Sequence, residues 1–202
     1  HQQHQQADPE VEKVRSAARS DLDAGKARNA RAKLKGALAK LRASASGPTM
    51  DAANILNDLG QVYTDLGQEI EAIASLEEAS DIFRQLYGPS DPRYGLAIDR
   101  LADAHTVAGR HDQALTIWKR LLKSMRKGLG TSHPGYQFTL KKAAGAAMAT
   151  GKMGAAVKVY KELIELTEGS PKAGEGHVEA FADARVQYAR ALAATGKLQA
   201  AL

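Results

Sequence analysis

The sequence predicts an all-α solenoid of antiparallel helix pairs, about four and a half repeats long. Three observations predict it. Glycines recur every 42 residues, with a last one after 45. An apolar pattern with helical spacing precedes each glycine, and a second such pattern follows the first four. Self-similarity at a fixed period of a few tens of residues is typical of stacked helical repeats. The glycines are Gly25, Gly67, Gly109, Gly151 and Gly196.

Each recurring glycine is expected to sit between two helices of a pair. One helix must end and the next must fold back within two or three residues. Such a turn needs a left-handed backbone conformation, which glycine adopts without the steric cost of a Cβ atom. The glycines therefore mark the turn inside each repeat.

The first repeat is expected over about residues 8–46. It begins at Asp8-Pro9-Glu10, where aspartate can cap a helix, proline fits its first position and the acid suits its first turn. Its second helix, over about 26–42, contains Lys and Arg but no acid. The other repeats are expected over about 49–88, 91–130, 133–168 and 175–202, the last truncated, so that residues 8–202 form a single array.

The helices of the later repeats follow from the same pattern. In the second repeat they are expected over 49–66 and 68–87. In the third, the first helix runs from 92 to the break at 109 and the second ends at 127; in the fourth, the first runs from 134 to the break at 151 and the second ends at 168. The first helix of the fifth repeat ends at 195. Residues 1–7 are expected to be a disordered polar tail. A glycine-rich connection covers 169–176, and 197–202 reads as the opening turn of another helix. We therefore expect the parent protein to continue beyond Leu202.

Composition limits the function classes. The chain has no cysteine, which excludes a disulfide framework and a thiolate zinc site and is compatible with a reducing compartment, cytoplasm or organelle interior. It has no apolar run long enough to span a membrane, so a soluble protein is expected. Net charge alternates along the chain: residues 1–48 and 91–132 are basic, and 49–90 are strongly acidic.

The second repeat resembles the tetratricopeptide repeat. That family has leucine, then Leu-Gly, then Tyr on the first helix, and Ala, a large apolar residue and Ala on the second. The matching residues here are Leu56, Leu59-Gly60, Tyr63, Ala72, Leu76 and Ala79. The third repeat keeps most of the pattern but has His105 in place of the tyrosine, where we expect a packed histidine.

The 42-residue period resembles the long-repeat branch of that family, typified by kinesin light chain. The extra length follows the second helix, where Leu86-Tyr87-Gly88 and Leu129-Gly130 precede Asp-Pro and His-Pro. The resemblance implies a right-handed superhelix that acts as a protein–protein interaction scaffold, with no catalysis and no cofactor. Its concave groove, built mostly from first helices, would bind an extended peptide or a helix of a partner protein.

Family geometry places certain positions before each glycine in this groove. Asn57 is the foremost candidate, because an asparagine amide can both donate to and accept from a peptide backbone. The middle of the predicted groove is acidic and rich in amides, so a basic or neutral extended segment is the expected partner. The candidate partner-binding residues are Arg15, Arg19, Asn57, Gln61, Asp65, Asp99, Asp103, Lys141 and Arg190.

Other readings of these residues are weaker. Asp99 and Asp103, four residues apart, could hold a divalent ion or act as acid and base, but no third ligand or nucleophile accompanies them, so neither a metal site nor a catalytic site is predicted. The lysine and asparagine clamp of chaperone-tail binders is missing, since Asp99 and Asp103 would repel a carboxylate.

Three further hypotheses concern the whole chain. It could be a regulatory or oligomerisation segment of a larger multidomain protein. It could self-associate through its open C-terminal repeat. Its basic helix over 26–42 could bind RNA, although that helix carries no aromatic residue on which bases could stack. No specific nucleic-acid binding is therefore predicted.

Overall fold

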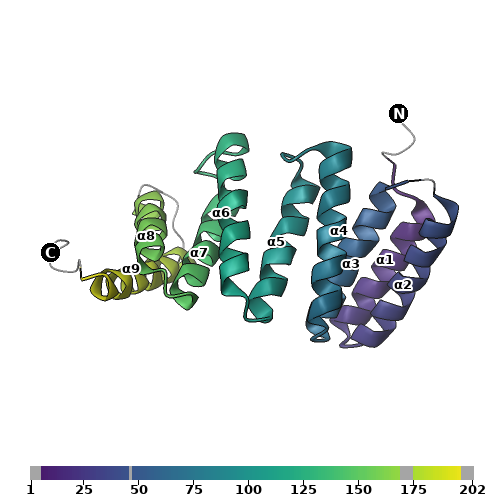
Figure 1. Cartoon of the computed structure of the whole chain (residues 1–202), viewed down its shortest axis with the longest axis horizontal. Coiled ribbons are helices and arrows are strands. Elements are labelled where there is room, and N and C mark those ends of the chain that lie inside the picture. The colour runs from purple at the N-terminus through teal and green to yellow at the C-terminus, as the bar shows by residue number, and fades with distance from the viewer. Residues whose placement is uncertain (1–5, 46, 169–174, 197–202) are drawn as a thin grey trace. The chain divides into compact units, whose positions relative to one another are not determined.

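The computed structural model describes residues 6–45, 47–168 and 175–196, and its regular secondary structure there is entirely α-helical (Figure 1). Residues 1–5, 169–174 and 197–202 lie outside the described residues. The predicted tail, the predicted glycine-rich connection and the predicted opening of a last helix fall wholly or partly on them. The helices are α1 (Pro9–Asp23), α2 (Ala27–Ser44), α3 (Met50–Asp65), α4 (Glu69–Tyr87), α5 (Pro92–Val107), α6 (His111–Gly128), α7 (Pro134–Ala149), α8 (Met153–Glu168) and α9 (Glu175–Ala194).

These helices agree with the predicted ones to within a few residues at each end. They group into two compact units, residues 1–109 and 110–202. The boundary falls at the third recurring glycine, between α5 and α6. The prediction of one continuous array over residues 8–202 stays a prediction.

The predicted turns are confirmed by the backbone. All five recurring glycines have a left-handed conformation, with φ between 71° and 75°. At Gly67 the turn is closed by two hydrogen bonds: the Gly67 N–H donates to the Thr64 carbonyl, and the Gln68 N–H donates to the Tyr63 carbonyl. This pattern pairs carbonyl groups that the end of a helix leaves free, so the same turn can recur at each repeat.

Three of the first helices begin at a capping residue followed by proline. Asp8, Asp91 and His133 precede α1, α5 and α7, and each side chain accepts a hydrogen bond from a backbone N–H in the first turn. The cap at Asp91 is extended by Arg93. Its guanidinium donates to both Asp91 carboxylate oxygens at 2.9 Å and lies 3.5 Å from the centre of the Tyr87 ring.

Replacing Asp91 by alanine is expected to lower the free energy of unfolding at pH 7 by about 1 kcal/mol, because α5 loses its cap. The hydrogen bond from Arg93 lowers the pKa of the Asp91 carboxyl below 3.8, against an opposing effect of burial. The stabilisation is therefore present above the unfolded-state pKa and is lost as pH falls through the lower folded-state pKa. Urea unfolding between pH 7 and pH 2 measures both effects.

Asp91→Asn is the control for this prediction, because its amide oxygen can still cap the helix without titrating. It should lose less stability than Asp91→Ala at pH 7. A wild-type advantage over Asp91→Ala that persisted unchanged at pH 2 would contradict the role given to the carboxylate.

The core of the first unit centres on α3, which packs against α1, α2, α4 and α5. Its apolar side chains Ile55, Leu59 and Val62 are at most 2% exposed. Gly60 lies in the same helix, where a Cβ atom would come within 2.3 Å of the Cγ and Cδ2 atoms of Leu76 on α4. The glycine therefore sets how closely α3 and α4 can pack.

The core of the second unit is built around two large aromatic residues. Trp118 of α6 and Tyr136 of α7 are 1% and 0% exposed. The Tyr136 hydroxyl reaches the edge of the core, where it donates to Glu162 of α8 and accepts from Arg126 of α6. One hydroxyl thus connects three helices of the unit.

The predicted packing of His105 is confirmed, since this residue is 8% exposed.

Among the helices that the structure describes, none combines the length and the apolar character that crossing a membrane requires.

Candidate functional site

The candidate site is the surface that α1, α3 and α5 share in the first unit, which we call the first-helix face. A chain of ion pairs runs across it. The Arg15 guanidinium donates to Asp58 at 2.7 Å, and the Arg100 guanidinium lies 3.7 Å from the same carboxylate. Arg100 also donates to the backbone carbonyl of Asn57 at 3.3 Å. One carboxylate of α3 therefore holds arginines from the helix on either side.

A small cavity opens beside these pairs. Its volume is about 60 Å³, and Arg15, Arg19, Asp58, Gln61 and Arg100 line its polar side. Within the described part of the chain, Arg19 makes no hydrogen bond and no ion pair. The cavity thus brings together three guanidinium groups and the Asp58 carboxylate, and Arg15 also donates to Glu12 at 2.9 Å.

The environment of Arg100 reflects these charges. Burial lowers the pKa of its guanidinium below its usual range, the Asp58 carboxylate opposes this, the nearby Arg19 and Arg15 lower the pKa further, and Asp99 raises it. The group stays charged at neutral pH. The Arg100 guanidinium lies beside Asp58 and is partly exposed, which makes it a candidate to bind a partner's carbonyl or carboxylate oxygen.

Carboxylates also lie on the first helices of this unit. The exposed Asp65 accepts a hydrogen bond from Gln61 at 3.0 Å. Asp99 and Asp103 lie one turn apart on α5, and both are partly exposed. On the same helix Leu96 and Val107 are 47% and 60% exposed. Helix α5 therefore offers carboxylates and accessible apolar side chains along its length.

The structure corrects the expected exposure of Asn57. Its side chain is 4% exposed. The physical reason is that α3 has a first helix on each side, so α1 and α5 cover this position. The neighbouring Asp58 points to the flanking arginines instead. Within the described residues, the Oδ1 atom of Asn57 is buried without a hydrogen-bond partner.

The structure brings together only part of the predicted set. Arg15, Arg19 and Gln61 line one cavity, and Gln61 also donates to Asp65. Asp99 and Asp103 do not line that cavity, and their part in a shared binding face stays a prediction. Lys141 on α7 and Arg190 on α9 are exposed in the second unit. In the residues that the structure describes, no group of three His, Cys, Asp or Glu side chains could hold a metal ion.

Sequence reasoning missed Asp58 and Arg100. A signal for them was present, because they occupy the same position in successive repeats, 42 residues apart, and carry opposite charges. Comparing charges between equivalent positions of adjacent first helices would have paired them. Reading each repeat alone did not.

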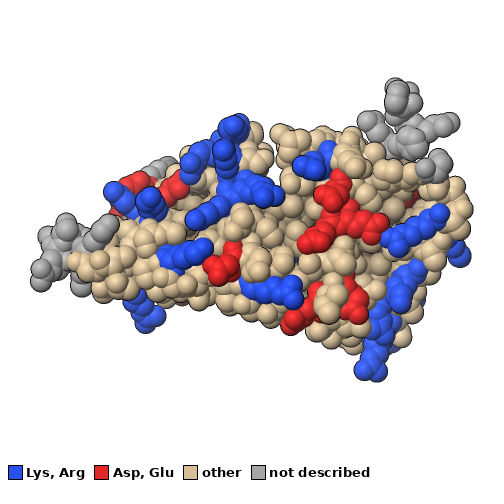
Figure 2. Space-filling view, viewed as in Figure 1, with Lys and Arg blue, Asp and Glu red and all other residues tan. Residues whose placement is uncertain are grey.

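The outer helices carry blocks of one charge. Figure 2 shows acidic side chains gathered over α4 and basic ones over α2 and α6. The two blocks meet within the first unit, where Arg42 of α2 donates to both carboxylate oxygens of Glu78 on α4 at 2.8 Å. Since both partners are about half exposed, this pair contributes little to stability.

Two family models, both described as tetratricopeptide repeat, match residues 51–106 and 96–135. No curated protein matches the sequence. The matched segments include the second repeat, in which the family pattern is most complete.

Solved structures share the fold along nearly the whole chain. A putative kinesin light chain from Podosopora anserina with nearly identical TPR-like repeats has a TM-score of 0.81 at 20% identity, covering 95% of this chain and 90% of that one. BtubC (BKLC) from P. vanneervenii has a TM-score of 0.75 at 14% identity, covering 94% and 74%. A Rap protein has a TM-score of 0.60 at 16% identity, covering 92% and 54%. These identities show the fold, an all-α helical repeat solenoid.

Proposed function

We propose that the first-helix face of this tetratricopeptide repeat protein binds an extended segment of a partner protein. Its helix pairs fold like kinesin light chain repeats, and such repeats are typical of protein-interaction scaffolds, which supports the proposal. The binding involves no catalysis by this chain.

The ordered polar chemistry of the first-helix face is the observation that carries this proposal. Arg15 and Arg100 are fixed by a shared carboxylate rather than free to move, so a ligand would lose little side-chain entropy to them. Arg19 and Gln61 open into the adjoining cavity. Among the structural neighbours, the Rap protein was solved in complex with Competence and Sporulation Factor. In that protein the fold accommodates a binding partner.

The charge of the face favours a particular kind of segment. Asp65 and Asp103 would pair with Lys or Arg side chains, and the exposed Leu96 and Val107 would contact apolar ones. Arg15, Arg19 and Arg100 would donate hydrogen bonds to backbone carbonyls of the segment. We therefore propose that the partner is a basic or neutral extended segment.

Affinity capture from the native extract tests this proposal after nuclease treatment, which removes partners bridged by nucleic acid. The face variant is Asp99→Lys with Asp103→Lys. Its matched control is Glu77→Lys with Asp81→Lys, two exposed acids with the same four-residue spacing on α4, away from the face. Both variants make the same change in net charge in the same unit.

The expected result is a protein that wild type and the α4 control retain and that the face variant loses. Circular dichroism and thermal unfolding must show that the face variant is folded. If the folded face variant retains the same proteins as wild type, the partner does not bind where we place it. Loss of all partners after nuclease treatment would favour nucleic-acid binding instead.

A further inference from the structure

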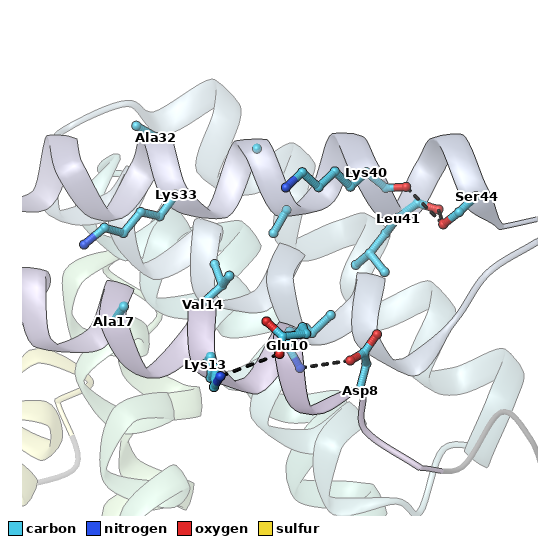
Figure 3. Close-up of a pocket in the computed structure, with 13 residues that line it drawn as sticks. Asp8, Glu10, Lys13, Val14, Ala17, Ala32, Lys33, Lys40, Leu41 and Ser44 are labelled. Carbon is cyan, nitrogen blue, oxygen red and sulfur yellow. Dashed lines mark hydrogen bonds and ion pairs between the residues drawn. The ribbon is translucent and has the colours of Figure 1, made fainter.

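A second surface, outside the first-helix face, lies between α1 and α2. It is a groove of about 630 Å³. Its floor is formed by Val11, Val14, Ala17, Ala37 and Leu41, and none of its lining residues comes from α3, α4 or α5. Figure 3 shows Val14 and Leu41 directed into the space between the two helices, and Lys33 and Lys40 along the α2 side. The groove is therefore an apolar trough with Lys33 and Lys40 on the α2 side and with Asp8, Glu10 and Lys13 on the α1 side.

The next helix pair shows what covers an equivalent surface. The residues 42 positions after Val14, Ala17, Ala37 and Leu41 are Leu56, Leu59, Ala79 and Phe83. Those four are at most 3% exposed, and α2 packs on the α3 helix of that pair. The residues of the first pair are only half-buried. The same repeat surface is thus covered by a helix in the second pair and open in the first.

Gly36 on α2 is a separate indication of an interaction surface. Glycine in a helix interior is unfavourable, so it usually has a packing reason. At Gly60 the reason lies within the chain, because a Cβ atom would collide with Leu76. At Gly36 an added Cβ would meet nothing within 4 Å. Since Gly36 lines the groove, it would let another backbone approach α2 closely.

The charges around the groove indicate the sign of what binds there. Helix α2 contains no Asp or Glu. Of the acids that line the groove, Asp8 caps α1 and Glu10 pairs with Lys13. On the other side Lys33 pairs with Asp21. Lys40 makes no ion pair within the described residues. The positions equivalent to Lys33 and Lys40 in the second pair are Ser75 and Ile82, both buried. A helix seated in this groove would therefore face lysines where the second pair has uncharged residues.

We propose that the groove between α1 and α2 binds an acidic amphipathic α-helix of a partner protein. Its apolar stripe, with side chains spaced three and four residues apart, packs on Val14, Ala17 and Leu41. Its carboxylates lie on the side that faces Lys33 and Lys40. Gly36 allows the two helices to come close. This site is independent of the first-helix face.

The test is a binding titration of the full chain with a fluorescent synthetic peptide. The probe is a helix of about 18 residues, or about 27 Å, with leucines at helical spacing and glutamates along one flank. A second peptide carries lysine in place of each glutamate. The groove variants are Lys40→Glu and Gly36→Phe. The control is Lys35→Glu, an exposed lysine of the same helix that does not line the groove.

The acidic peptide should bind wild type, and Lys40→Glu and Gly36→Phe should each weaken it about tenfold or more, while Lys35→Glu changes the affinity less than threefold. The lysine peptide should not bind. Because the Gly36 side chain position is open, Gly36→Phe should fold, which circular dichroism checks.

Three outcomes would overturn the proposal. The acidic peptide could fail to bind. It could lose as much affinity with Lys35→Glu as with Lys40→Glu, which would show nonspecific attraction to a basic helix. Finally, wild type could form a dimer that Gly36→Phe abolishes in analytical ultracentrifugation. A second copy of the chain, rather than an acidic partner helix, would then occupy the groove.

Discussion

Replacing Trp118 by alanine is expected to lower the free energy of unfolding of the second unit by about 4 kcal/mol. The ring is 1% exposed between the helices of that unit, so its removal loses buried apolar area and leaves a cavity that surrounding side chains fill only partly. Urea unfolding followed by far-ultraviolet circular dichroism measures the loss, since the chain has no second tryptophan to report by fluorescence.

Phe138→Ala is the matched control. Phe138 is also an aromatic residue of the second unit, and the Lys142 ammonium lies 4.7 Å from its ring centre and 4.9 Å from that of Trp118. However, Phe138 is 59% exposed, so its removal should cost less than about 1 kcal/mol. Equal losses for the two variants would show that Trp118 does not form the core of the unit.

Gly60→Ala is expected to lower the free energy of unfolding of the first unit by about 2 kcal/mol. Alanine is the better helix former, but its Cβ would lie 2.3 Å from side-chain atoms of Leu76, which is itself 0% exposed. Relief requires α3 and α4 to separate or Leu76 to leave its rotamer, and overpacking of this kind typically costs a few kcal/mol. Thermal and urea unfolding of the purified variant measure it.

The same substitution at Gly36 should have the opposite sign. Its Cβ would enter open space, so Gly36→Ala should raise the free energy of unfolding by about 0.5–1 kcal/mol through helix propensity alone. A Gly60→Ala variant as stable as Gly36→Ala would contradict the close packing of α3 on α4.

The fold could be predicted from the sequence because its determinants are local and repeated. The glycine turns, the Asp-Pro and His-Pro helix starts and the apolar spacing each specify a few neighbouring residues, and each recurs. The structure confirms them at φ values between 71° and 75° and in the caps at Asp8, Asp91 and His133. Each of these patterns alone predicts only a local turn or helix start, but their recurrence at a fixed spacing predicts the repeat fold.

The candidate site was less predictable because it depends on which helices flank each residue. Asn57 and Asp58 are adjacent in sequence, yet α1 and α5 bury the first, and their arginines pair with the second. Likewise, the α1–α2 groove follows from the open outer side of one helix pair, which no local pattern encodes. Such features come from contacts between repeats.

The affinity of the captured partner's binding segment for the first-helix face tests the central claim most directly. The segment would be made as a peptide and titrated by calorimetry into wild type, into the Asp99→Lys, Asp103→Lys variant and into the Glu77→Lys, Asp81→Lys control. We expect the face variant to bind at least tenfold more weakly and the control to match wild type within about threefold. Equal affinity for all three proteins, or equal losses in both variants, would contradict the assignment of the first-helix face as the partner-binding site.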